Sequence, residues 1–120
     1  AAFHICTNLT NITFPDSITT IGDVAFSHCT SLTSVIIPNG VTTIDEYAFF
    51  SCLKLMNIEI PASVTVIGDA AFSTYAEGDF DEYRDIYYSG TEEDWEKINM
   101  QPEFPDANIH FDCTMPEEFR

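Results

Sequence analysis

Apolar residues recur along this chain with a fixed step of 23 positions. The step is clearest for four phenylalanines, each preceded by alanine: Phe3, Phe26, Phe49 and Phe72. A fixed period of roughly 20 to 50 residues is typical of proteins whose repeats bury their apolar sides only against neighbouring repeats. The pattern therefore predicts a β-rich solenoid, in which each 23-residue repeat forms one coil.

Within each repeat, the run L-x-x-V/I-x-I/F-P alternates apolar and polar residues. This period of two predicts a short strand, which ends at proline because proline has no N–H for the ladder. One set of side chains is then expected to point into the core: Ile12, Phe14, Val35, Ile37, Ile58 and Ile60. The intervening set is expected to form two columns facing solvent: Asn11, Thr13, Ser34, Ile36, Asn57 and Glu59.

The second half of each repeat reads V-T-x-I-G-x-x-A-F and predicts a turn followed by a brief second strand. Its glycine position is occupied by Gly22, Asp45 and Gly68, residues that tolerate a positive φ better than most. A left-handed backbone is therefore expected there. The Ala-Phe pair is expected to turn the chain back and to place the phenylalanine rings in one stacked column.

The full repeat, I-G-x-x-A-F-x-x-C-x-x-L-x-x-V-x-I-P-x-x-V, resembles the BspA-like leucine-rich repeats over roughly residues 2–73. The resemblance implies a bacterial or protist protein that is secreted or displayed at the cell surface. It also implies a role in adhesion or protein binding rather than catalysis, with a host extracellular or surface protein as the class of partner.

The pattern shifts after Phe72. The strand positions return as Tyr83, Ile86 and Tyr88, five residues late, which predicts an insertion over residues 77–82. Asp85 and Tyr87 then extend the two solvent-facing columns.

A different module is expected at the C-terminal end. Thr91 is placed to cap a helix with an acidic first turn, and Trp95 and Ile98 give that helix an apolar stripe. The segment 108–112 predicts a final short strand. We therefore expect a single domain over 1–120, with repeats over about 1–73, an irregular last coil over 74–90 and a helix-plus-strand cap over 91–120.

The charge balance excludes two classes of partner. The formal net charge is −16, from 20 acidic and only four basic residues, so no basic stripe exists to bind nucleic acid or an anionic membrane surface. No apolar run in this segment is long enough to cross a bilayer, and no signal peptide is recognisable. Because the chain opens halfway through a repeat, it is expected to be a piece of a longer array.

No residue set predicts catalysis, a cofactor or a metal. Cys6, Cys29 and Cys52 occupy equivalent positions, so a linear file of buried free thiols is expected rather than a tetrahedral zinc site. The histidines have no ligand spacing, and serine has no positioned histidine and aspartate. The acidic stretch 79–85 fails the EF-hand pattern at its fifth and sixth places, which leaves a looser Ca²⁺ site as an alternative.

The sequence thus predicts a non-enzymatic leucine-rich-repeat solenoid that binds proteins through the solvent-facing columns of its sheet. The expected ligand-binding residues are those of the two columns: Asn11, Thr13, Ser34, Ile36, Asn57, Glu59, Asp85 and Tyr87. The alternative is a purely structural stalk that spaces another part of a larger surface protein.

Overall fold

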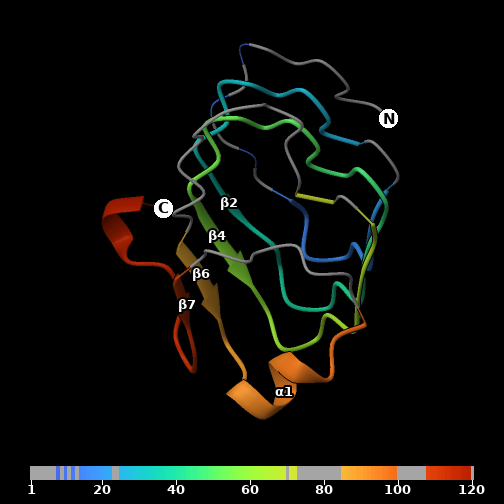
Figure 1. Ribbon diagram of the computed structural model, residues 1–120, viewed down its shortest axis with the longest axis vertical. Helices are drawn as coiled ribbons and strands as arrows, with labels where there is room; N and C mark the ends of the chain where they lie inside the picture. The colour runs from blue at the N-terminus through green and yellow to red at the C-terminus, as the bar shows by residue number, and fades with distance from the viewer. Residues whose placement is uncertain are drawn as a thin grey trace.

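The computed structural model is a stack of parallel β-strands joined by turns (Figure 1). It describes residues 8, 10, 12, 14–22, 25–69, 71, 72, 85–99 and 108–119. In these ranges the elements are β1 (Thr20–Ile21), β2 (Ser34–Ile36), β3 (Thr43–Ile44), β4 (Asn57–Ile60), β5 (Val66–Ile67), β6 (Asp85–Tyr88), α1 (Glu92–Glu96), β7 (Asn108–His110) and a 3-10 helix, η1 (Glu117–Phe119).

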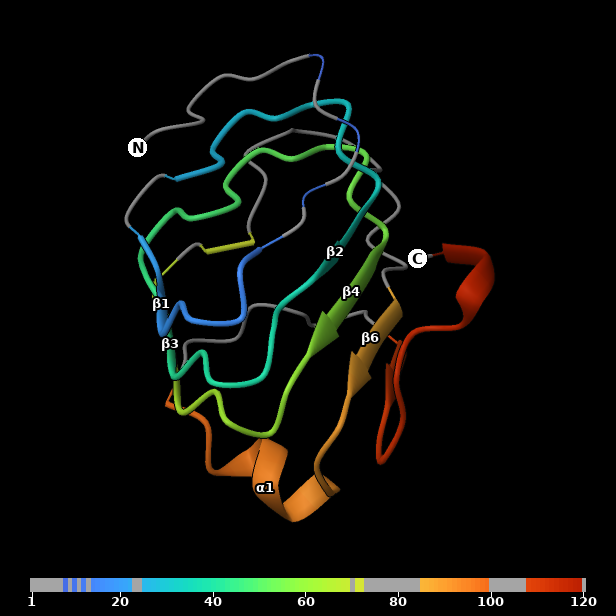
Figure 2. The same cartoon turned by 180° about the vertical axis from the view of Figure 1, so that it is seen from behind.

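The strands form two parallel sheets on opposite sides of the molecule (Figure 2). One sheet has the order β2-β4-β6-β7 and the other has the order β1-β3-β5. Ser34 pairs with Asn57 in the first sheet and Thr20 pairs with Thr43 in the second, so both registers follow the step of the sequence repeat. Successive repeats therefore pair in parallel, with the offset that the sequence repeat predicts.

The core lies between the two sheets and follows the predicted alternation. Val35, Ile37, Ile58 and Ile60 are each at most 1% exposed. Since these residues alternate with the half-buried residues Ile36 and Glu59, the period of two in the sequence is a true strand pattern.

The phenylalanine column is present on the turn side of the core. The ring centroids of Phe26 and Phe49 lie 5.3 Å apart with 10° between the ring planes, and those of Phe49 and Phe72 lie 5.1 Å apart with 4°. The backbone N–H of Phe49 donates to the carbonyl of Ala71 at 2.7 Å. Main-chain bonds therefore hold the repeats together beside the rings as well as within the sheets.

The prediction of a left-handed backbone at Gly22, Asp45 and Gly68 is wrong. Positive φ occurs instead at His28 (63°) and Ser51 (59°), which are equivalent positions just after the phenylalanines. At Gly68, an added Cβ would lie 2.5 Å from the backbone nitrogen of Glu46. Glycine is required there because two repeats approach closely, not because of its φ angle.

The register of β6 supports the predicted insertion. Asn57 pairs with Asp85, a separation of 28 residues (85 − 57), which is five more than the repeat step. Ile86 and Tyr88 are buried as expected. Tyr83 and the insertion 77–82 lie outside the described residues.

The helix α1 begins as predicted. The Thr91 side chain accepts a hydrogen bond from the Asp94 N–H, while the Asp94 carboxylate accepts one from the Thr91 N–H, each at 3.1 Å. Hydrogen bonds to the Asp94 carboxylate from the backbone N–H and from the side chain of Thr91 lower the pKa of Asp94 below its ordinary value of 3.8. After the helix, Ile98 is 7% exposed in the core, and Trp95 packs edge-on against Tyr88 with ring centroids 5.1 Å apart.

The segment that follows α1 returns to both sheets. Asn99 forms a parallel bridge with Val66, and β7 then pairs with β6. Figure 2 shows α1 spanning the end of the molecule between the two sheets. No helix in the described ranges is long and apolar enough to cross a membrane.

Candidate functional site

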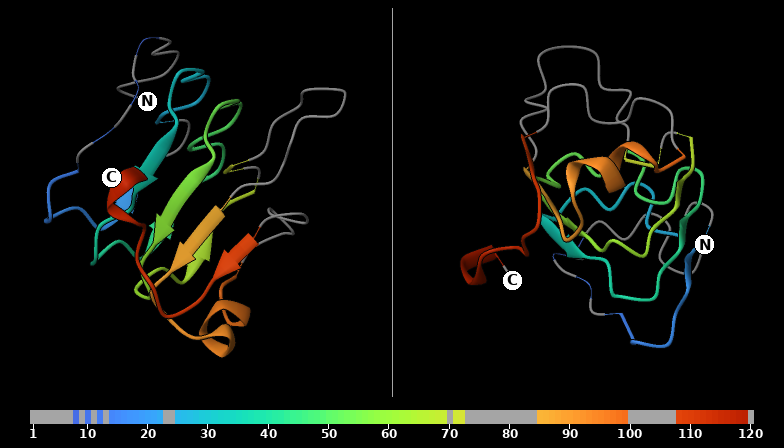
Figure 3. Two further views of the ribbon diagram at one scale, coloured as in Figure 1. Left: turned by 90° about the vertical axis from the view of Figure 1, so that its left-hand side faces the viewer. Right: turned by 90° about the horizontal axis from the view of Figure 1, so that it is seen from below.

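The outer face of the β2-β4-β6-β7 sheet carries the candidate site, and the left view of Figure 3 shows its strands side by side. Register places Ile36 beside Glu59, and Glu59 beside Tyr87. A second row is formed by Ser34, Asn57 and Asp85. The strand pairing thus brings together six of the eight residues expected in the columns, whereas Asn11 and Thr13 lie outside the described residues.

Tyr87 departs from the expectation, because it is only 8% exposed. The ring of His110, from β7, stacks on the Tyr87 ring with centroids 4.9 Å apart and 11° between planes. Burial raises the pKa of Tyr87 above 10.0, and the negative charges of Asp85, Cys113 and Glu118 raise it further. The prediction that Tyr87 faces solvent is therefore wrong: the side chain lies on the outer face but is covered.

The chain's own C-terminal segment, residues 111–119, follows β7 and returns to the same face. A turn at Asp112 (φ 55°) directs this segment back, and the Cys113 N–H donates to the carbonyl of Tyr88 at 3.2 Å. The Met115 N–H then donates to the Glu59 carboxylate at 2.7 Å, and Met115 is only 2% exposed. Two backbone N–H groups, those of Cys113 and Met115, and the buried Met115 side chain therefore hold this segment against β6 and β4.

A side-chain contact between His110 and Asp85 joins β7 to β6 beside this segment. The His110 Nε2 atom lies 3.0 Å from the Asp85 Oδ1 atom, with both side chains partly exposed. Sequence reasoning missed this arrangement because the C-terminal residues do not follow the repeat. The signal available was Met115, an apolar residue among acidic and polar neighbours.

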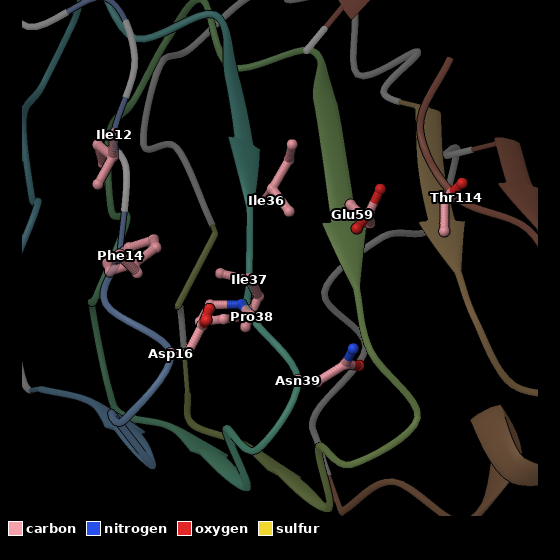
Figure 4. Close-up of a pocket in the computed structure, with 9 residues that line it drawn as sticks. All are labelled: Ile12, Phe14, Asp16, Ile36, Ile37, Pro38, Asn39, Glu59 and Thr114. Carbon is pink, nitrogen blue, oxygen red and sulfur yellow. The ribbon is translucent and has the colours of Figure 1, made fainter. Parts of the chain in front are cut away.

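A groove of about 630 Å³ lies on the same face, beside the C-terminal segment (Figure 4). Ile36 of β2 and Glu59 of β4 contribute to its lining from neighbouring strands, and Thr114 contributes from the C-terminal segment. Its complete described lining is Ile12, Phe14, Asp16, Ile36, Ile37, Pro38, Asn39, Glu59 and Thr114. The groove therefore extends from the first repeat to the C-terminal segment.

The lining combines apolar and acidic groups. Ile12, Phe14, Ile36 and Pro38 are half-buried, so their side chains keep some accessible surface. Asp16 is exposed and Glu59 is half-buried, while the other seven lining residues are uncharged. This mixture suits contact with a polypeptide, because protein interfaces combine apolar anchors with a polar surround.

The cysteines and the acidic stretch 79–85 are the other candidates for a chemical site. Cys29 and Cys52 are fully buried, and the Cys52 Sγ lies 3.1 Å from the carbonyl oxygen of Phe26. Cys6 and most of the acidic stretch 79–85 lie outside the described residues. Within the described part of the chain, no three His, Cys, Asp or Glu side chains are grouped so that they could hold a metal ion.

Comparison with protein families decides the identity of the repeats. Residues 1–79 match the family described as "BspA type Leucine rich repeat region (6 copies)". The chain belongs to this BspA-type leucine-rich-repeat family. The matched residues include the strands β1 to β5, which pair with a constant offset.

One solved structure is similar to these BspA-type repeats. It is the crystal structure of a leucine rich cell surface protein from Faecalibacterium prausnitzii A2-165, with 37% identity and a TM-score of 0.71. The alignment covers 81% of this chain and 24% of that protein, so the chain spans about a quarter of its length. No curated protein matches the sequence.

Proposed function

We propose that the chain is a non-catalytic protein-interaction or adhesion module, displayed at the cell surface or secreted, that binds a protein through the outer face of the β2-β4-β6-β7 sheet. The observation that carries the proposal is the groove of about 630 Å³ on that face. Membership of the BspA-type family supports protein binding, and the similar Faecalibacterium protein is described as a cell surface protein. A host extracellular or surface protein is the expected class of partner.

The finer architecture belongs to the same proposal. Each 23-residue repeat forms one coil of a solenoid within a single domain over 1–120, with repeats to about residue 73, an irregular coil over 74–90 and a cap over 91–120. Support comes from the shared offset of the pairs Thr20 with Thr43 and Thr43 with Val66. Such a stack presents a wide, rigid face, which suits binding without catalysis.

Ile36 is the residue on which the proposal depends most. It is the apolar member of its column, beside Glu59 and across the groove from Phe14. Apolar anchors in a polar surround account for most of the binding energy of typical interfaces. Half-buried Ser34 and Asn57 of the neighbouring row would then form part of the polar rim.

The test measures binding of the purified chain to a panel of purified matrix and serum proteins by surface plasmon resonance. Ile36→Ser should weaken binding by more than about fivefold, the effect of losing an interface residue worth at least 1 kcal/mol. Leu53→Ser is the matched control, because Leu53 is 41% exposed and lies outside the groove. Both variants should keep the wild-type melting temperature to within a few degrees.

Two outcomes would contradict the proposal. Binding that survives Ile36→Ser but is lost in Leu53→Ser would place the interaction on the turn side of the repeats. A wild-type chain that binds no protein of the panel would favour the structural stalk.

A further inference from the structure

The proposed function does not specify the charge of the partner, and the acidic lining of the groove restricts it. Two of its described lining residues, Asp16 and Glu59, are acidic, and none is basic. The whole chain is acidic, with a net charge of −16. A charged partner is therefore attracted to this face only if it is positive, since the summed field of the protein steers oppositely charged groups toward it.

The C-terminal segment shows what kind of backbone the face accepts. Residues 111–116 have no helix or strand, and they lie against the sheet with the Met115 N–H donating to Glu59 and the Met115 side chain buried. Thr114 of this segment lines the groove. The groove is therefore continuous with a surface on which an extended, apolar-anchored chain is already bound.

We propose that the groove binds an extended peptide segment of a partner protein that carries both apolar and basic side chains. The peptide lies beside the C-terminal segment, its apolar side chains contact Ile36 and Phe14, and its lysine or arginine side chains pair with Asp16 and Glu59. The inference rests on the proposed function, and it specifies the chemistry of the partner at the same face.

Fluorescence anisotropy with three labelled peptides on one Ser/Thr background tests this proposal. The first carries lysine and isoleucine, the second has glutamate in place of lysine, and the third has serine in place of isoleucine. Only the first should bind the full chain with measurable affinity. Its affinity should fall as salt is raised, because the ion pairs at this open groove are screened.

Charge-removing variants of the chain locate the site. Glu59→Gln keeps an oxygen that can accept the Met115 N–H, and Asp16→Asn keeps the size of the side chain. Together they should weaken binding of the first peptide by about tenfold, as expected when two partly exposed ion pairs are lost. Glu46→Gln is the matched control, since Glu46 is exposed and lies outside the groove.

Equal binding of the glutamate and lysine peptides would overturn the proposal, as would unchanged affinity in the Asp16→Asn/Glu59→Gln variant.

The experiments distinguish failure of the proposed function from failure of the peptide proposal. If Ile36→Ser abolishes binding of a panel protein while the double charge variant binds that protein and the lysine peptide normally, the interaction face stands and the basic-peptide chemistry is wrong. If no panel protein binds but the lysine peptide shows the expected charge dependence, the groove chemistry stands and the choice of partner proteins is wrong.

Discussion

Removing the ring of Phe49 tests whether the stacked phenylalanines hold the repeats together. Phe49 is fully buried and lies between Phe26 and Phe72, with centroid distances of 5.3 and 5.1 Å. Phe49→Ala deletes the middle ring, so both neighbouring rings lose a packing partner. The vacated space lies between backbone segments that are hydrogen-bonded to each other, which limits collapse around it.

The expected loss is about 3 to 5 kcal/mol, which combines the lost transfer free energy of the ring with the cost of the cavity. Folded domains are stable by only about 5 to 15 kcal/mol, so this change removes a large fraction of the total. For a chain of this size the melting temperature should fall by roughly 10 to 20 °C.

Thermal and urea unfolding followed by circular dichroism measure this change. Phe49→Leu should lose roughly a third to a half as much, because leucine fills part of the cavity. Leu53→Ala is the surface control and should stay within about 0.5 kcal/mol of wild type. A melting temperature unaltered by Phe49→Ala would show that the stacked rings do not stabilise the repeats, because removing a fully buried ring from a core is otherwise costly.

Two further predictions concern titratable groups. Asp94 has a lowered pKa in the folded chain, so its contribution to stability is present above the unfolded pKa of about 4 and is lost as the pH falls through the lower folded value. Asp94→Asn should therefore destabilise the chain at neutral pH and match wild type at the acid end of a series of urea titrations; an equal difference at every pH would contradict this. Tyr87 has a raised pKa, so its contribution is complete below about pH 10 and is lost as the pH rises through the folded value. Removing residues 114–120 should lower the pKa of Tyr87 toward 10.0. The pKa is measured by ultraviolet titration, with Tyr87→Phe as the reference that identifies the signal of this phenol. An unchanged pKa would show that the C-terminal segment does not shield the ring.

The repeat pattern predicted the strands and their pairing because one sequence offset fixes both. Once Phe26, Phe49 and Phe72 are aligned, every other equivalent position is aligned with them, and the burial of Val35 and Ile58 follows from alternation. The five-residue delay after Phe72 was visible for the same reason. In a periodic sequence, the repeat offset therefore also predicts which residues pair between neighbouring strands.

The features that the sequence did not predict depend on contacts without a repeat. Nothing periodic links Met115 to Glu59, which lie 56 residues apart, or His110 to Tyr87, so neither contact could be predicted from alternation. Gly68 was misassigned because glycine serves both positive φ and close backbone approach, and composition does not separate the two uses. The groove depends on the path of the first repeat relative to β2, which a strand pattern does not specify.

Hydrogen–deuterium exchange on the complex with a bound panel protein locates the interaction surface, because it reports which backbone segments a partner covers. We expect added protection in the segments 34–39 and 57–59, which include five residues of the groove lining, and little change in the turns over 47–54. Protection confined to 47–54, with the 34–39 segment exchanging as in the unbound chain, would show that the outer face of the sheet is not the interaction surface.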